Sequence, residues 1–436
     1  MVANYIRSVI TYLNKNVRYA VLRNYEGLPH NNSSRDIDII IDRGEFNRVR
    51  WGLAATLLQD DWQLFSWLDN GRLITYVCAK MREDGGVEMV QWDLFTSTSI
   101  HGVVLASANE MLASRAYNGV LYHVSKEWEF LDKYLYNRAV GDAYPAKYQQ
   151  TRDMVSVSDV VRAKIADIFG CDGLHECDRL SGQKLFRRAL WRNFRRSPLS
   201  TLTSVISSRV LYLWLFLTSR TSPCISFTGA DGVGKTTVID TLRQQIAGVY
   251  GEATEYFHFR PLLIPNIGDV AESAGVMRGV DRDYASPHRS KRKGVVSSLL
   301  RLCYYTLDYV VGYWVEVKPH RKLTKVIIFD RYFSDVVVDS RRSSIYLNTK
   351  FLYLWSRLFI PRFRYNFLIT ATPTTIRQRK QELESEQIES INAKMDYLAT
   401  KKGYYLIHNN GVVEVCVAEI MAIIITEQHK YNIGHI

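Results

Sequence analysis

A glycine-rich segment places the strongest constraint on what this chain can fold into. Residues 224–237 read CISFTGADGVGKTT, which satisfies the pattern G-x-x-x-x-G-K-[ST] from Gly229 to Thr236. A short apolar strand precedes the glycines, and residues 237–246 follow with the apolar spacing of a helix. A strand, a glycine loop and a helix in this order form a phosphate-binding loop. The segment therefore predicts an α/β domain that binds a nucleotide, and a chance glycine turn is the alternative.

The residue types in this loop each have a chemical reason. Glycines let the backbone approach phosphates closely, so that N–H groups at the helix start face the phosphate oxygens. Lys235 is placed to reach the β- and γ-phosphates, and the Thr236 hydroxyl to ligate magnesium. We therefore expect ATP and Mg²⁺ as cofactors. The expected ATP-binding residues of the loop are Gly229, Ala230, Asp231, Gly232, Val233, Gly234, Lys235, Thr236 and Thr237.

A second apolar segment, residues 325–329, ends in Asp330, Arg331 and Tyr332. In α/β sheets, ligands bind beyond the carboxyl ends of the strands. The pattern therefore predicts that Asp330 and Arg331 lie near the phosphate loop. Asp330 would hold magnesium or orient the attacking oxygen, and Arg331 would bind a phosphate or an acidic acceptor. A salt bridge at the end of the strand is the alternative.

A third segment, FLITATP at residues 367–373, predicts a strand that leads into a helix over residues 374–389. The helix carries Arg377, Arg379 and Lys380. Cations on a mobile lid can close over a transferring phosphate and stabilise its charge. We expect Arg379 to be catalytic and Arg377 and Lys380 to bind ATP, with a solvated helix face as the alternative.

Together these segments resemble the thymidylate kinase family of nucleoside-monophosphate kinases. The family pattern F-x-G-x-D-G-x-G-K-[ST]-T, the D-R-Y after a buried strand, and a Pro-led helix with arginines all occur within residues 223–436. The resemblance implies a P-loop kinase domain with a central parallel sheet. It makes Lys235, Asp330, Arg331 and Arg379 the expected catalytic residues. The expected acceptor-binding residues are Arg260, Asp308, Arg331 and Tyr332.

The chain departs from the family where a nucleotide acceptor would sit. The family's Arg-Glu-Pro-Gly-Gly loop is reduced to Arg260-Pro261, and the helix around Asp308 lacks the usual arginine. The chain resembles a branch often found beside bacterial surface-polysaccharide genes. We therefore expect an ATP- and Mg²⁺-dependent kinase for a saccharide or another acceptor that is not thymidine monophosphate, acting in surface glycan assembly. A thymidylate or deoxynucleoside monophosphate kinase, and a nucleotide-dependent sensor or toxin, stay open as alternatives.

Carboxylates in the first part of the chain predict a separate site. Asp36 and Asp38 lie two apart on a predicted strand, so both face the same side, and Asp93 ends another predicted strand. Such acids can hold the two magnesium ions of nucleotidyl transfer. The segment resembles the DNA polymerase β-like nucleotidyltransferase superfamily and implies an α+β domain. Arg23-Asn24 replaces the superfamily's Gly-Ser, so an active site, an acceptor-binding module and a plain surface strand all stay open.

The region between these domains reads as helical and basic. Residues 184–196, KLFRRALWRNFRR, place Phe186, Leu190 and Phe194 on one helix face, with Leu185 off it. A cationic helix with an apolar face is typical of binding to anionic lipid. An interdomain helix with solvated arginines is the alternative, and nucleic acid is the less favoured partner. The apolar run at 210–217 is shorter than the ~18–20 residues that span a bilayer.

Composition supports this reading. The 436 residues carry a net charge of +12, which favours anionic partners. The cysteines follow no disulfide framework, and the first residues lack the charge and apolar core of a signal peptide. We expect a cytoplasmic protein, peripheral at the inner membrane. The expected domains are a nucleotidyltransferase-like domain at 1–150, a helical connector at 151–222 and a kinase-like domain at 223–436.

Overall fold

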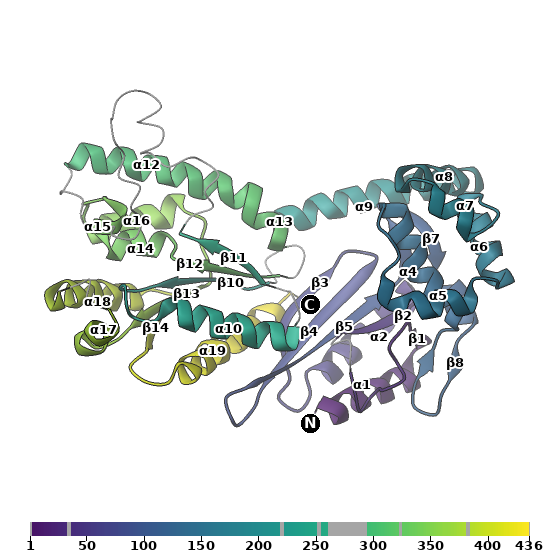
Figure 1. Ribbon diagram of the computed structural model, residues 1–436, viewed down its shortest axis with the longest axis horizontal. Coiled ribbons are helices and arrows are strands. Elements are labelled where there is room, and N and C mark those ends of the chain that lie inside the picture. The colour runs from purple at the N-terminus through teal and green to yellow at the C-terminus, as the bar shows by residue number, and fades with distance from the viewer. Residues whose placement is uncertain are drawn as a thin grey trace. The chain divides into compact units, whose positions relative to one another are not determined.

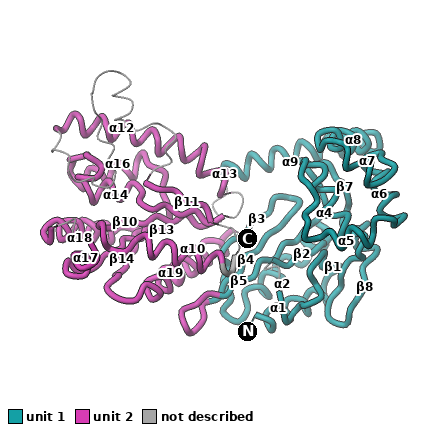
Figure 2. Tube along the Cα trace, viewed as in Figure 1, with its two compact units in different colours: residues 1–80, 88–218, 436 teal, residues 81–87, 219–435 magenta. Residues whose placement is uncertain are grey.

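The computed structural model describes residues 2–32, 36–218, 222–250, 254–259, 294–321, 325–380 and 384–435, and the side chains of 248–250 are not part of that description. The chain divides into two compact units (Figure 2). Unit 1 comprises residues 1–80, 88–218 and 436, and unit 2 comprises residues 81–87 and 219–435. Both units contain helices and a sheet.

Unit 1 is built on a seven-stranded mixed sheet in the order β3-β4-β5-β2-β1-β9-β8. Its strands are β1 (Tyr19–Val21), β2 (Asp36–Ile41), β3 (Gln63–Asp69), β4 (Leu73–Met81), β5 (Val87–Phe95), β8 (Ala116–Tyr117) and β9 (Tyr122–His123). The predicted strand that carries Asp36 and Asp38 and the predicted strand near Asp93 are confirmed as β2 and β5. The central strands β2 and β5 are parallel, and Asp38 lies opposite Asp93.

Two cores cover the two faces of this sheet. Alternation along β2 sends Ile37, Ile39 and Ile41 into the first core and Ile40 into the second. Helices α1 (Val2–Asn16) and α2 (Arg43–Leu57) pack together at the first core. The second core receives residues from β6 (Ser97–Ile100), β7 (Val103–Ser107), α3 (Ala108–Ala113) and α4 (Lys126–Val140).

The expected connector helices pack within unit 1. They are a short 3-10 turn (Ala146–Tyr148), α5 (Gln149–Val155), α6 (Asp159–Phe169), α7 (Leu174–Arg179), α8 (Gly182–Arg196) and α9 (Pro198–Thr218). In α8, Leu185 and Ala189 are fully buried, whereas Phe186 and Leu190 are only partly buried against the same core. The side of the helix that faces the core therefore runs through Leu185, which lies off the predicted stripe of Phe186, Leu190 and Phe194.

Helix α9 is longer than the apolar run on which the sequence argument rested. It has 21 residues and is long and apolar enough to cross a membrane by length and composition, with 6% of its most apolar window buried. The expectation that the apolar segment is too short to span is therefore wrong as a matter of length, since neutral serines and threonines extend the helix towards its start.

Unit 2 contains a five-stranded sheet in the order β11-β12-β10-β13-β14, and every neighbouring pair in it is parallel. Its strands are β10 (Cys224–Thr228), β11 (Thr254–His258), β12 (Val326–Asp330), β13 (Tyr365–Thr370) and β14 (Tyr404–His408). Every residue of β10, β12 and β13 is buried, as expected for parallel strands that are covered on both faces. The predicted central parallel sheet is confirmed.

Helices lie on both sides of this sheet. In Figure 1, α10 (Lys235–Tyr250) and α19 (Val413–Ile433) lie below it, and α12 (Val295–Gly312), α14 (Phe333–Val338) and α16 (Thr349–Phe359) lie above it. The other helical segments are a π-helical turn (Tyr313–Val317), α13 (Lys318–Arg321), α15 (Ser340–Ser343), α17 (Pro373–Arg379) and α18 (Ser385–Ala399). The single helix predicted at 374–389 is wrong, because the backbone becomes extended at Lys380.

Candidate functional site

The phosphate loop connects β10 to α10 and needs its glycines. Gly232 and Gly234 have φ angles of +83° and +92°, where other residues are strained. A Cβ atom on Gly229 would lie 2.3 Å from the carbonyl oxygen of Ile369. The loop therefore takes its shape from glycine and packs closely against the carboxyl end of β13.

Lys235 begins α10 and folds back over the loop. Its Nζ donates to the carbonyl oxygens of Gly229 at 2.7 Å and Ala230 at 2.9 Å. The side chain is buried, and this burial, together with the cation of Arg331, lowers the pKa of Lys235 to about 7. Thr236 and Thr237 follow it, exposed at the start of the helix. The first turn of a helix presents free N–H groups and a positive dipole end, which attract anions.

Asp330 ends β12 directly beside the loop strand, where it lies opposite Phe227. Its Oδ2 accepts a hydrogen bond from Tyr256 at 3.1 Å and lies 3.5 Å from His258 Nδ1. Burial opposes ionisation, but the hydrogen bond with His258 and the cations Lys235 and Arg331 lower the pKa of Asp330 overall.

The other carboxylate oxygen of Asp330 is the unsatisfied atom of the site. Oδ1 is buried and has no hydrogen-bond partner among the described residues. A buried carboxylate oxygen is unfavourable without a hydrogen-bond partner. Carboxylate oxygen is also a preferred ligand of magnesium or of its bound water. The residues therefore fit a magnesium ion held by Asp330 and by the Thr236 hydroxyl.

Arg331 is held by carboxylates on both sides. Its NH1 donates to both carboxylate oxygens of Asp335, at 2.9 and 3.1 Å, and its NH2 lies 2.5 Å from Oδ1 of Asp231 in the phosphate loop. Arg342 binds the second oxygen of Asp231. Arg331 is 5% exposed, so the strand-end salt bridge weighed as an alternative is present. The side chain of Asp231, expected at the nucleotide, is used in these ion pairs.

The predicted lid segment contacts the loop through Arg379. Its NH1 donates to the carbonyl oxygens of Val233 and Asn409, both at 3.1 Å. Asn409 also donates to Val233 O at 2.8 Å. Arg377 and Lys380 are exposed. Arg379 therefore lies at the loop already, and sequence reasoning missed its partner Asn409, which follows β14.

The structure describes three of the four expected acceptor residues, namely Asp308, Arg331 and Tyr332. Arg260 lies outside the described residues. Tyr332 is buried, stacks on Phe363 and donates its hydroxyl to Pro361 O at 2.7 Å. Asp308 is fully buried within α12. Arg331 contacts the phosphate loop through Asp231.

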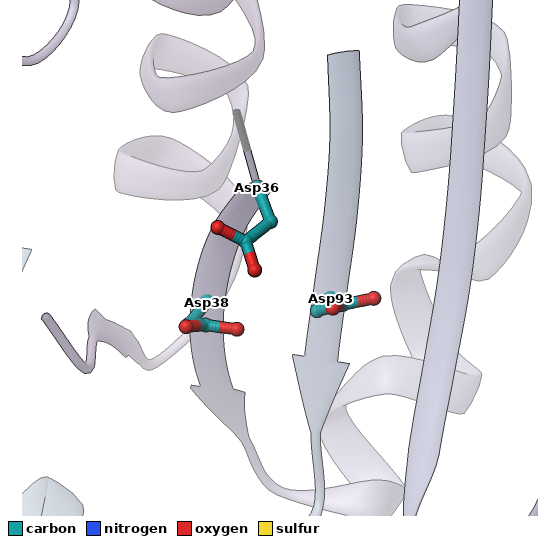
Figure 3. A group of neighbouring side chains, drawn as sticks. All are labelled: Asp36, Asp38 and Asp93. Carbon is teal, nitrogen blue, oxygen red and sulfur yellow. The ribbon is translucent and has the colours of Figure 1, made fainter. Parts of the chain in front are cut away.

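The three carboxylates of unit 1 do come together. Figure 3 shows Asp36 and Asp38 on β2 and Asp93 on the neighbouring β5. One carboxylate oxygen of each lies within 4.8 Å of the others. Thr75 and Gln91 donate to Asp93 at 2.6 and 2.8 Å. Burial and the charge of Asp38 raise the pKa of Asp93 to about 7.

A buried arginine already neutralises part of this group. Arg23 Nε lies 2.6 Å from Asp38 Oδ2, and its NH1 donates to Asp132 at 2.9 Å. All three side chains are buried. Sequence reasoning found Arg23 in place of Gly-Ser but missed this ion pair, because Asp132 lies 109 residues further along the chain.

Comparisons with known proteins give little beyond this geometry. No protein-family model and no curated protein matches the chain. Among 117 matching chains of solved structures is a thymidylate kinase from Ehrlichia chaffeensis. It is 16% identical, the match covers 46% of this chain and 98% of that one, and the TM-score is 0.33.

Proposed function

We propose that unit 2 is an ATP- and Mg²⁺-dependent phosphotransferase. The observation that carries this proposal is the buried, unpartnered Oδ1 of Asp330 beside a glycine loop that begins a helix with Lys235. A cation next to Asp330 and phosphates over the loop would satisfy both the carboxylate and the exposed N–H groups of the helix start. Phosphoryl transfer depends mainly on such positioning and on electrostatic stabilisation.

The side chains then have distinct roles. Lys235 leaves the carbonyl oxygens of Gly229 and Ala230 and turns to the phosphates, where its charge stabilises the transition state. Asp330 and Thr236 would hold magnesium, which would supply positive charge at the phosphate oxygens. Arg379 fixes the loop through Val233 and Asn409 and stands close enough to share in binding the phosphates. Arg331 holds the phosphate loop against the end of β12. The part of its guanidinium that binds no carboxylate contacts the acceptor.

We propose an acceptor other than thymidine monophosphate, a saccharide in surface glycan assembly. This proposal is supported by the missing family loop after Arg260-Pro261 and by the engagement of the Tyr332 hydroxyl with Pro361. Both features reduce the donors available to a nucleotide acceptor. A deoxynucleoside monophosphate kinase and a nucleotide-dependent sensor or toxin remain the alternative functions.

Product analysis by mass spectrometry tests the function. Purified protein is incubated with ATP, magnesium and a panel of nucleoside monophosphates and saccharides. A product heavier by one phosphoryl group on a saccharide supports the proposal. Phosphorylation of thymidine monophosphate alone would favour the nucleotide kinase. Hydrolysis of ATP with no phosphorylated product would favour the sensor.

We also propose that α9 lies on an anionic membrane surface on the cytoplasmic side. Exposed apolar residues follow one face of the helix at helical spacing: Leu199, Leu202, Ile206, Val210, Leu213 and Leu217. The opposite side is attached to unit 1, because Ser204 donates to Gly102 O at 2.7 Å and Val205 packs on the core. A helix held along one side suits an interfacial position, and the exposed cations Arg187 and Arg195 of the preceding α8 suit anionic lipid.

For unit 1 we propose a divalent-metal site at Asp36, Asp38 and Asp93 in which Arg23 acts as a permanent second cation. The convergence of the three carboxylates supports a metal, and the Arg23–Asp38 ion pair argues against room for two. On this basis the unit serves better as a binding module than as a two-metal nucleotidyltransferase.

A further inference from the structure

Unit 2 has a cationic cavity at the end of the sheet opposite the phosphate loop. The cavity has a volume of about 900 Å³, and Cys224, Tyr365 and Tyr405 line it from the amino ends of β10, β13 and β14. The phosphate loop leaves the carboxyl end of the same β10. A strand rises about 3.3 Å per residue, so the five residues of β10 separate the two sites by more than ten ångströms.

Positive charge dominates the lining of this cavity. Its acidic residue is Glu427, which is already paired with Lys430 at 2.7 Å. The cations that line it are Arg321, Arg357, Arg362, Arg364, Lys402 and Lys430. Like charges gathered around a concave surface repel one another and concentrate anions from solution. The cavity therefore favours a ligand with more than one negative charge.

Arg321 is a buried cation in the lining whose guanidinium is only partly hydrogen-bonded. It is 8% exposed, its NH1 donates to the Tyr313 hydroxyl at 3.0 Å, and its Nε is buried with no hydrogen-bond partner among the described residues. No described carboxylate forms an ion pair with it. A buried guanidinium normally has a carboxylate or phosphate partner, because burying an unpaired charge is costly. Arginine also binds phosphate in a bidentate manner.

Aromatic side chains accompany the cations. The guanidinium of Arg364 lies 3.4 Å from the centre of the Tyr431 ring, and the Tyr365 hydroxyl donates to the buried Gln428 at 2.7 Å. Trp314, Leu358 and Phe359 line the cavity and are 44%, 67% and 49% exposed. Such surfaces suit the ring or chain that carries a phosphate, and a bare inorganic anion would leave them uncovered.

We infer that this cavity is a second ligand site, which binds an organic phosphate monoester at a place distinct from the phosphate loop. The monoester could be a soluble molecule or the headgroup of a phospholipid, since both present the same anionic group. The inference does not rest on the kinase proposal, because no residue of the phosphate loop contributes to the cavity.

Isothermal titration calorimetry with 4-methylumbelliferyl phosphate tests the soluble source, and sedimentation with phosphatidylcholine vesicles, with and without phosphatidic acid, tests the lipid source. Both are done with the full chain without ATP, because ATP is itself an anionic phosphate that would compete for the cavity, and the comparison of the cavity variant with the control separates the cavity from the phosphate loop. The test variant is Arg357→Gln with Arg362→Gln, two exposed cavity residues. The matched control is Lys15→Gln with Lys350→Gln, two exposed cations away from the cavity.

Wild type and the control should bind at least one probe, and the cavity variant should bind it about tenfold more weakly or worse, since it loses two charged phosphate contacts. Arg321→Gln should weaken the same probe, provided that its circular dichroism and thermal unfolding match wild type. Binding of the ester alone identifies a soluble ligand, and binding of phosphatidic acid vesicles alone identifies a lipid. Absence of binding to both probes, or equal binding by the cavity variant and the control, overturns the inference.

Discussion

The guanidinium of Arg331 lies 2.5 Å from Oδ1 of Asp231, which joins the end of β12 to the phosphate loop. The same guanidinium binds Asp335 through both carboxylate oxygens. The glycines permit the shape of the loop, and this buried ion network holds it against the neighbouring strand. A residue that the sequence suggested as an acceptor ligand is thus also a structural support of the site.

Replacing Arg331 should lower stability as well as activity. Arg331→Ala leaves Asp335 buried without its cation, and breaking a buried ion pair in this way costs about 3–5 kcal/mol. Urea denaturation should show that loss in the free energy of unfolding, whereas Arg341→Ala, an exposed arginine on α15, should change it little. If Arg331→Ala leaves stability and ATP affinity unchanged and weakens only the use of the acceptor, Arg331 has the purely acceptor-binding role that was first expected.

Replacing Lys235 should remove ATP turnover and leave the fold intact. Its charge acts on the phosphates in the transition state, and in the folded unit its bonds are to two loop carbonyl oxygens. Lys235→Ala should keep less than about a tenth of the turnover, a loss of more than ~1.4 kcal/mol of transition-state stabilisation. Lys350→Ala is the control, and circular dichroism checks the fold. Retention of more than that fraction would contradict the phosphate-loop assignment.

Arg23 should compete with metal in unit 1. Removing its guanidinium frees Asp38, so Arg23→Ala should bind Mn²⁺ about tenfold more tightly than wild type, as measured by the electron paramagnetic resonance signal of free Mn²⁺. Asp36→Asn added to Arg23→Ala should reverse the gain. If the unit is an active nucleotidyltransferase after all, Asp38→Asn should abolish magnesium-dependent nucleotide transfer and leave the kinase activity unaltered. Equal Mn²⁺ affinity in wild type and Arg23→Ala would show that Arg23 does not occupy a metal position.

The cations of α8 should differ in their contribution to membrane binding. Arg188 and Arg196 are paired with Glu176 and Asp167, whereas Arg187 and Arg195 form no ion pair with a described acid. Reversing Arg187 and Arg195 to Glu should release the protein from anionic liposomes, because each cation near such a surface contributes about 1 kcal/mol. Binding should also weaken as salt rises.

The matched comparison for this prediction is the reversal of Arg188 and Arg196, which should have the smaller effect on liposome sedimentation. If neither pair of reversals changes the sedimentation with liposomes, α8 and α9 are packing helices of unit 1 and do not bind the membrane.

Local patterns in the chain predicted much of the fold but little of its electrostatics. The buried strands β10, β12 and β13 and the glycine loop are visible as short apolar runs and fixed spacings. The ion-pair partners of Arg331 and Arg23 cannot be recognised from such local patterns, because Asp231 and Asp132 lie 100 and 109 residues away in the chain. Such pairs form only when the sheet brings distant segments together.

Helix α8 illustrates a second limit. The spacing predicted a lipid-facing stripe through Phe186, but it did not predict which side of the helix packs on the core of unit 1. The fold selects the side with Leu185 and Ala189, because small Ala189 and fully buried Leu185 allow α8 to approach α4 and α6 closely.

The most direct test of the central claim follows the γ-phosphoryl group of labelled ATP. Wild type and Lys235→Ala are incubated with magnesium and either thymidine monophosphate or a membrane saccharide extract, and labelled products are separated. The account predicts label on a saccharide acceptor with wild type and none with Lys235→Ala. Efficient labelling of thymidine monophosphate, in the ~10⁴–10⁸ M⁻¹s⁻¹ range of enzymes on their own substrates, would contradict the glycan acceptor. Absence of label on every acceptor, with only slow release of phosphate, would contradict the phosphotransferase itself.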